Sequence, residues 1–357
     1  MENIYNKLAD FLNTMPNGFP PAESGVEIKI LQKIFSEEEA SLFMNLKLVF
    51  ENSDQISKRT GIEAEYLKKK LPEMMDKGQI MGIQTKDFSM YRAAPFVFGI
   101  FEFQMKRMDH EMALLCEKYD KEVFAYKFFT ATPALMKTIP VGIEVRDDTT
   151  IEPYESVASL IEGAKSWAVR DCVCKKEKSL LGKKCDKPIE VCLSFAPVEH
   201  AFDSDNSSRA ITKEEAYAIL KISEEAGLVH MTSNYKSGHF YICNCCRCCC
   251  GPLTKYIAVS KKAAAKSNYK AIVDTDACIS CGVCLDRCQA GAVEIKDYAV
   301  ITDCIGCGLC ITTCPTNAIK LVKRDSDDIL YVPKNEREWM ELRAKDRGQN
   351  DDYKKLL

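Results

Sequence analysis

The sequence predicts an α+β protein with several domains, and three observations lead to this expectation. The chain has 357 residues, more than the roughly 100–200 residues of one ordinary domain, and its 46% hydrophobic and 28% charged residues are a normal globular balance. Stretches with helical periodicity alternate with short strand-like stretches. The 19 cysteines are clustered, with one before residue 170, ten in 172–250 and eight in 278–314.

This cysteine content indicates metal or cluster binding. An odd number of cysteines cannot all pair as disulfides, and residues 1–21 lack the cationic and apolar regions of an export signal. We therefore expect a cytoplasmic, reducing compartment, in which disulfides are rare and dense thiols are typical of metal ligands. No apolar run approaches the roughly 18 residues of a membrane span, so no span is expected.

Residues 1–35 are expected to form an N-terminal helical segment. Ile4, Leu8 and Leu12 follow helical spacing and would lie on one face. The Pro- and Gly-rich cluster at 16–21 then interrupts the helix.

Residues 36–92 predict three helices followed by a hairpin. Ser36 and Glu39 form a capping box that opens the first helix, and Gly61 ends a short second helix. The third helix is expected over 62–77, and a polar turn then separates two short strands. This order of elements resembles a winged helix-turn-helix domain.

The charge of this segment argues against DNA binding. Residues 36–92 hold nine Lys/Arg and ten Asp/Glu, and the three lysines at 68–70 in the third helix have acidic neighbours. DNA-binding modules usually present a basic face, because neutralising phosphates supplies much of their affinity. We therefore expect a scaffold or docking module, with DNA binding kept as an alternative.

Two segments follow before the last cysteine-rich region. Residues 93–139 are rich in Phe and Met and are expected to form a helical connector, in which the isolated Cys116 is a buried small hydrophobe. Residues 140–269 are expected to form a mainly helical, cysteine-rich middle domain. Thr212 and Glu215 form a second capping box there.

The strongest motif is duplicated within a compact segment at 270–322. The pattern Cys-x2-Cys-x2-Cys-x3-Cys occurs twice, first as Cys278, Cys281, Cys284 and Cys288, and then as Cys304, Cys307, Cys310 and Cys314. The flanking sequences 290–295 and 316–321 repeat as well. Three thiolates at this spacing let one tight loop wrap a face of a cubane cluster, while a fourth comes from a remote segment. The duplicated run resembles the bacterial two-cluster ferredoxin.

The resemblance implies two [4Fe–4S] clusters, with the fourth cysteine of each run ligating the other cluster. The ligands of one would be Cys278, Cys281, Cys284 and Cys314, and those of the other Cys304, Cys307, Cys310 and Cys288. The sequence departs from the repeat at Gln289, which stands where the second run has Pro315, so the turn after Cys288 is less constrained. A pair of zinc sites is the alternative, but zinc does not require this spacing twice.

Two further motifs supply candidate ligands in the middle domain. The first comprises Cys172, Cys174, Cys185 and Cys192, and the second comprises Cys243, Cys246 and Cys249, with Cys245 and Cys248 in a staggered frame. The first could hold one further [4Fe–4S] cluster, stabilised by six lysines in a loop at 175–187, or that loop could be an ordinary solvated turn. The ten thiols of this domain fit one or two clusters, including one that borrows ligands from both motifs.

Residues 323–357 carry nine positive and nine negative side chains and are expected to form a charged, solvated tail with one helix near Glu336–Lys345. Trp339 is a candidate anchor for this tail. The sequence contains neither a Gly-x-Gly-x-x-Gly fingerprint after a strand nor a Walker loop, so nucleotide and flavin binding have no support. His230 and His239 flank the second cysteine motif and are expected to be structural, with proton transfer or ligation as alternatives.

The layout as a whole resembles a family of anaerobic iron–sulfur proteins, which implies a redox iron–sulfur protein. We expect an electron-transfer protein or oxidoreductase subunit that relays single electrons through the two ferredoxin clusters, and one or two middle-domain clusters, to a redox partner protein. One alternative is a redox-sensing transcriptional regulator, and another is a reductase with an open site on a middle-domain cluster. The sequence indicates no catalytic residue and no oligomeric state.

Overall fold

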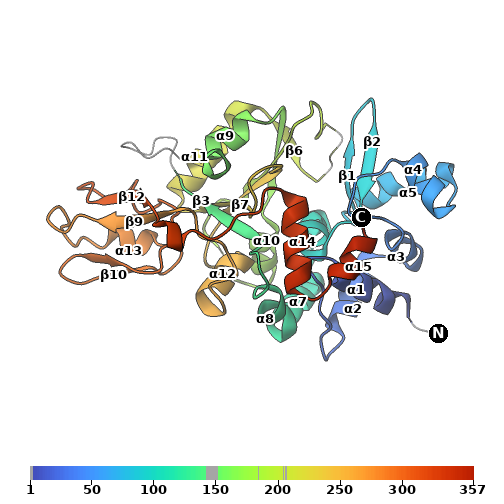
Figure 1. Ribbon diagram of the computed structural model, residues 1–357, viewed down its shortest axis with the longest axis horizontal. Coiled ribbons are helices and arrows are strands. Elements are labelled where there is room, and N and C mark those ends of the chain that lie inside the picture. Colours follow the sequence, from blue (N-terminus) through green and yellow to red (C-terminus); the bar gives the residue numbers. More distant parts are fainter. Residues whose placement is uncertain (1–2, 142–151, 184, 204, 206) are drawn as a thin grey trace.

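The computed structural model describes residues 3–141, 152–183, 185–203, 205 and 207–357. The molecule is elongated, as Figure 1 shows, with the N-terminal helices at one end and the segment with the duplicated cysteine run at the other. A six-stranded sheet lies between them. The two C-terminal helices return to the N-terminal end.

The N-terminal region contains five helices and a hairpin, in this order: α1 (Ile4–Thr14), α2 (Val26–Ile34), α3 (Glu37–Phe43), α4 (Ser53–Thr60), α5 (Ala64–Asp76), β1 (Met81–Gln84) and β2 (Ser89–Arg92). The capping box of Ser36 and Glu39 is confirmed at the start of α3. Gly61 ends α4 in the left-handed conformation, with φ +76°, which a residue without Cβ adopts at little cost. The order of α3, α4, α5 and the hairpin is the expected one, whereas a winged-helix function for these elements stays a prediction.

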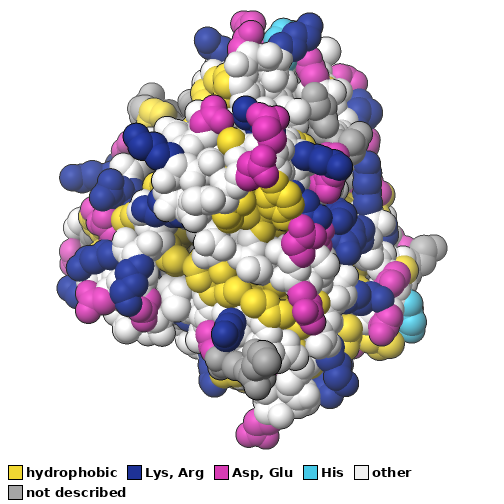
Figure 2. Space-filling view, turned by 90° about the vertical axis from the view of Figure 1, so that its right-hand side faces the viewer, with side chains coloured by type: hydrophobic (Ala, Val, Ile, Leu, Met, Phe, Trp, Pro, Cys, Tyr) yellow, Lys and Arg dark blue, Asp and Glu magenta, His cyan; other side chains and the backbone are white. Residues whose placement is uncertain are grey.

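Charges of both signs are mixed on this end of the molecule, which Figure 2 shows face-on, with a band of apolar side chains between them. In α5, Lys68 pairs with Asp54 and Glu65, and Lys70 pairs with Glu39 among other carboxylates. Lysines engaged in this way are less available to phosphates.

The connector is helical, as expected, and is built from short pieces: η1 (Phe96–Ile100), α6 (Phe101–Phe103), η2 (Gln104–Lys106), α7 (His110–Tyr119), η3 (Asp120–Phe124) and α8 (Ala125–Phe128). Cys116 on α7 is buried, also as expected. Among the described residues, no helix combines the length and apolar character needed to cross a membrane.

The middle domain contains a sheet that the expectation of a mainly helical domain did not include. Its centre is a sheet in the order β3-β7-β8-β5-β4-β6, with every neighbouring pair antiparallel. The strands are β3 (Met136–Ile139), β4 (Ser166–Asp171), β5 (Glu190–Ala196), β6 (Arg209–Ile211), β7 (Val229–Ser233) and β8 (Tyr241–Cys245). All five residues of β7 are buried, so both faces of the strand are covered, and the alternation of Val229 and Met231 with His230 and Thr232 marks no exposed face.

The helices of this domain are η4 (Pro153–Glu155), α9 (Val157–Glu162), α10 (Val173–Leu180), α11 (Lys213–Glu225) and α12 (Gly251–Ala258). The capping box of Thr212 and Glu215 is confirmed at the start of α11. The lysine-rich loop expected over 175–187 is wrong in its first part, because α10 extends to Leu180.

The duplicated cysteine run folds into two small antiparallel pairs with a short helix: β9 (Tyr269–Val273), α13 (Val283–Arg287), β10 (Val293–Ile295), β11 (Ala299–Ile301) and β12 (Ile319–Lys323). Strand β9 pairs with β12, and β10 pairs with β11. The first pair joins the start of the segment to its end and therefore closes it as a unit.

The expected helix near Glu336–Lys345 is present and Trp339 is buried, as expected of an anchor, but the tail as a whole packs on the protein instead of being solvated. The tail contains η5 (Ser326–Asp328), α14 (Glu336–Asp346) and α15 (Asn350–Lys355). Trp339 is only 6% exposed, and the guanidinium of the buried Arg343 donates to the carbonyl oxygens of Phe128, Ala131 and Pro133 at 2.6–2.7 Å. These hydrogen bonds compensate for burying a cation and fix the tail on the connector.

A prediction concerns Glu39, which is buried and receives hydrogen bonds from Lys77, Gln79 and the Ser36 amide. Burial by itself raises the pKa of Glu39, but these partners outweigh it and lower the pKa from 4.5 to about 2. A lowered folded-state pKa stabilises the fold above pH 4.5, and this stability is lost as the pH falls towards 2. Glu39→Gln should lower the free energy of unfolding at pH 7 by about 2–3 kcal/mol.

Denaturant unfolding at pH 7 and at pH 3 measures this effect, which should shrink at the lower pH. The control is Glu38→Gln, since Glu38 is on the same turn with an exposed side chain. Equal losses for the two variants at pH 7 would contradict the assignment.

Candidate metal centre

The cysteines of the duplicated run lie in loops whose backbone amides point at sulfur. The Ala299 amide donates to Cys278 Sγ at 3.4 Å, and the Ala292 amide donates to Cys288 Sγ at 3.2 Å. Cys304 Sγ accepts from the amides of Ala271 at 3.5 Å and Gly306 at 3.3 Å. Amide hydrogen bonds to sulfur stabilise thiolates and the anionic clusters they hold, so these loops fit an iron–sulfur cluster.

The fold brings the last cysteine of the first run to the second run. Burial raises the pKa of the Cys307 thiol to about 12, and the neighbouring Cys304 and Cys288 raise it as well. Burial also raises the pKa of the Cys310 thiol, and Cys288 is again among the neighbours responsible. The four cysteines expected from the resemblance to form one ligand set are therefore neighbours.

The middle domain gathers six thiols around one cavity. Contacts between thiols link Cys172 with Cys174, Cys192 with Cys243, and Cys245 with both Cys243 and Cys250. Cys172 also interacts electrostatically with Cys192 and Cys243, and Cys174 with Cys250. Both cysteine motifs therefore contribute to a single set, which matches the expected possibility of one cluster that borrows ligands from both.

Sheet geometry explains this convergence. Cys243 and Cys245 are two residues apart on β8 and therefore point to the same face of the sheet. Strand β5 is the neighbour of β8, with Leu193 opposite Ile242, and this register brings Cys192 next to Cys243.

The remaining three thiols of this cavity set come from helix starts. Cys172 is the N-cap of α10, Cys174 lies in its first turn, and Cys250 is the N-cap of α12. The partial positive charge of a helix N-terminus stabilises nearby anions. The chain thus directs two helix N-termini at a group of potential thiolates.

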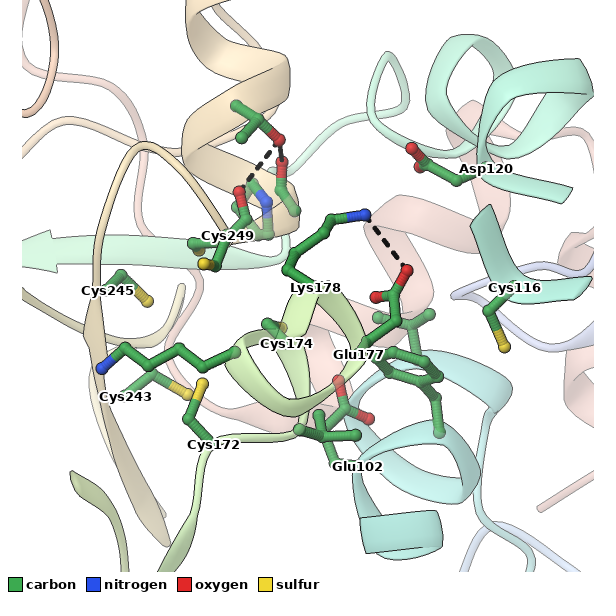
Figure 3. Close-up of a pocket in the computed structure, with 18 of the residues that line it drawn as sticks. Glu102, Cys116, Asp120, Cys172, Cys174, Glu177, Lys178, Cys243, Cys245 and Cys249 are labelled. Atoms are coloured by element: carbon green, nitrogen blue, oxygen red, sulfur yellow. Dashed lines mark hydrogen bonds and ion pairs between the residues drawn. The ribbon is translucent and has the colours of Figure 1, made fainter. Parts of the chain in front are cut away.

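All six thiols line a cavity of about 320 Å³, and in Figure 3 the side chains of Cys172 and Cys243 point towards one another. Arg170 lies opposite Cys192 on the neighbouring strand, and its buried Nε has no hydrogen-bond partner. A buried cation with an unpaired N–H fits an anionic group in this cavity. Glu102 also lines it, and burial raises the pKa of this carboxyl to about 7.

The other four middle-domain thiols form a tighter group, Cys185, Cys246, Cys248 and Cys249, of which Cys246 and Cys249 also line the cavity. Their sulfur atoms all lie within 4.8 Å of one another. Cys185 therefore contacts the second motif and does not form a set with Cys172, Cys174 and Cys192. Within the second motif, Cys243 belongs to the six-thiol set, whereas Cys246 and Cys249 belong to the tighter group.

The two histidines next to the second motif are buried in polar contacts. His230 Nδ1 lies 2.5 Å from Asn244 Oδ1, and burial lowers the pKa of His230 to about 4. His239 stacks on Tyr235 and contacts Thr232, and burial lowers its pKa to about 4 as well. Both are neutral near pH 7, in agreement with structural roles.

Residues 300–320 match the family model of the 4Fe-4S binding domain. This segment contains the whole second cysteine run, and the match indicates 4Fe–4S binding there. No curated protein matches the chain, and no solved structure matches it.

Sequence reasoning did not assign Cys250, Glu102 or Arg170 to the site. Cys250 was counted among the ten thiols, but the spacing of its motif gave no reason to separate it from Cys249. Glu102 reaches the cavity from the connector, which lies far from both motifs in sequence, and Arg170 reaches it from the end of β4. A signal for Arg170 exists in its position two residues before Cys172.

A prediction for the cavity set follows from its shared ligands. Cys172→Ala and Cys243→Ala should each remove iron and sulfide together, about four of each per chain, because each variant opens the same ligand set. Iron and acid-labile sulfide analysis of anaerobically purified protein measures the loss. The control is Cys116→Ala, since Cys116 lines the cavity but has Glu177, Lys178 and Asp120 as its electrostatic neighbours. Full iron and sulfide in Cys172→Ala and Cys243→Ala would contradict a cluster in this cavity.

Proposed function

We propose that the protein transfers single electrons between iron–sulfur clusters in the ferredoxin-like segment and a cluster in the middle-domain cavity. The observation that carries this proposal is the 4Fe–4S family match at 300–320 beside a second, buried set of six thiols. [4Fe–4S] clusters supply one-electron oxidation and reduction when bound. The chain supplies the ligands, the amide hydrogen bonds to sulfur and the exclusion of water.

Two ligand sets are proposed in the ferredoxin-like segment, with the exchange of fourth ligands that the resemblance implies. One set is Cys278, Cys281, Cys284 and Cys314, and the other is Cys304, Cys307, Cys310 and Cys288. The second set is supported because Cys288 interacts electrostatically with Cys307 and Cys310, as Cys304 does.

Gln289 supports a direct connection between this segment and the middle domain. Its side-chain oxygen accepts a hydrogen bond from the Arg247 amide at 3.0 Å, and Arg247 lies between Cys246 and Cys248. Gln289 itself follows Cys288 and is buried. The residue that departs from the Pro of the second run thus makes a contact that Pro could not make, and it joins the two cysteine-bearing segments.

Exposed apolar side chains of the ferredoxin-like segment are suited to docking of a redox partner. Cys281 is exposed, and Ile279 beside it is 64% exposed. Val283 and Leu285 on α13 add further exposed apolar surface. An apolar surface next to a cluster ligand is a suitable place for transient docking of an electron donor or acceptor.

A reductase with an open site is the second candidate. Its support is Glu102, a carboxyl with a pKa raised to about 7 by burial, in the cavity with the six thiols. Such a group could hold and deliver a proton near neutral pH. The regulator alternative has less support, because lysines of α5 are paired with carboxylates.

The first test is the metal content of the full chain. Anaerobically purified and reconstituted protein should contain about eight irons and eight sulfides for the ferredoxin-like segment, plus those of the cavity. Iron and sulfide analysis with EPR of the reduced protein measures this content. A value below about eight irons per chain would refute the proposal.

A second test targets the contact between domains. Gln289→Met keeps the size of the side chain but removes the acceptor, so it should leave iron content unchanged, increase hydrogen exchange at the Arg247 amide and slow reduction of the middle domain. Gln289→Glu keeps an acceptor oxygen and serves as the matched control. Stopped-flow reduction and hydrogen-exchange mass spectrometry provide the measurements. Unchanged exchange and unchanged reduction in Gln289→Met would exclude this contact as the connection.

A further inference from the structure

The tightest group of ligand atoms in the described part of the chain consists of four thiols: Cys185, Cys246, Cys248 and Cys249. Cys185 Sγ lies 3.8 Å from Cys246 Sγ and 3.6 Å from Cys248 Sγ. Cys248 Sγ lies 3.2 Å from Cys246 Sγ and 3.7 Å from Cys249 Sγ. Within the described residues, this is the group of three or more Cys, His, Asp or Glu side chains whose ligand atoms all lie within 4.8 Å of one another.

These separations match four ligands around one ion. A tetrahedral metal ion with metal–sulfur bonds of about 2.3 Å places its sulfur ligands about 3.8 Å apart. A cubane cluster places an iron between each thiolate and the cluster core and therefore needs a wider cage. The eight cysteines of the duplicated run are spaced more widely than the quartet. In the described structure, no three of their sulfur atoms lie within 4.8 Å of one another.

The surroundings of the quartet also favour a closed site. Cys246 and Cys249 are buried, at 1% and 4% exposure, against Val191 and Leu228, whereas Cys248 is exposed. Structural zinc sites have four protein ligands and no open position, and soft tetrahedral thiolate sets select zinc or iron. The four sulfur atoms of this quartet supply four protein ligands, and all four are soft thiolates.

We propose that Cys185, Cys246, Cys248 and Cys249 bind one divalent metal ion in a mononuclear tetrahedral site, occupied by zinc or by a single iron. Each thiol loses its proton to solvent on binding, and the ion changes no oxidation state in this step. The metal ion would link the segment after α10 to the turn between β8 and α12. Its four ligands are distinct from the six thiols of the cavity set, although two of them, Cys246 and Cys249, also line the cavity, and the site contains no sulfide.

The position of the proposed metal site indicates which part of the structure the metal ion would stabilise. Cys172 and Cys174 precede Cys185, whereas Cys245 and Cys250 lie on either side of the turn that carries the other three ligands. A metal ion at the quartet therefore ties together the two segments that supply the cavity set.

The test compares metals with sulfide in the full-length chain. Cys185→Ala and Cys248→Ala should each lose one zinc or one iron per chain while acid-labile sulfide stays constant. The control is Cys116→Ala, which should retain all metals. Loss of zinc identifies a zinc site and loss of iron identifies a mononuclear iron site, and either result supports the proposal. Parallel loss of about four irons and four sulfides, or no loss of metal, would overturn it.

A second measurement uses the unaltered protein, in case the variants do not accumulate. X-ray absorption at the zinc edge should show four sulfur neighbours at about 2.3 Å and no second metal nearby. If the protein contains no zinc, Mössbauer spectra of iron-57 protein should show one component from an isolated iron in addition to the clusters. The absence of both signals would reject the site, and this result is independent of whether the ferredoxin-like clusters assemble.

Discussion

The pairing of β5 with β8 is the constraint on which the cysteine arrangement depends. The first motif enters the sheet on β5 and the second on β8, about 50 residues later, and only their pairing places Cys192 beside Cys243. A register slip of one residue would turn the cysteines of β8 to the other face of the sheet. The sheet that sequence patterns did not reveal is therefore the element that assembles the metal-binding region.

Charge is the second requirement of this arrangement. Several thiols must lose protons in a buried place, where isolated anions are costly. The chain compensates with Arg170, with the N-termini of α10 and α12, and with amides directed at sulfur in the ferredoxin-like loops. Arg170 lies two residues before Cys172, and α10 and α12 begin directly after Cys172 and Cys250, so folding and charge compensation occur together.

Local signals were predicted well, and long-range pairings were not. The capping boxes at Ser36 and Thr212 and the helix end at Gly61 depend on residues within one turn, and the structure confirms them. The second cysteine run was recognisable because its ligand spacing is local, and the family match covers it. The six-stranded sheet depends on contacts between distant segments, and β7 is buried along its whole length although its residues alternate between apolar and polar. The partner of Cys185 lies 61 residues away, so spacing alone could not select it.

The return of the tail to the N-terminal end has a consequence for biosynthesis. Arg347 donates to Asn13, a contact across 334 residues, and the Leu48 amide donates to the Leu356 carbonyl. A ribosome must therefore translate both cysteine-rich regions before the N-terminal core can be covered. During that interval the nascent chain exposes apolar surface and unliganded thiols together, and contacts of such long sequence separation form slowly. Maturation of the metal sites and protection from aggregation thus fall in the same time window.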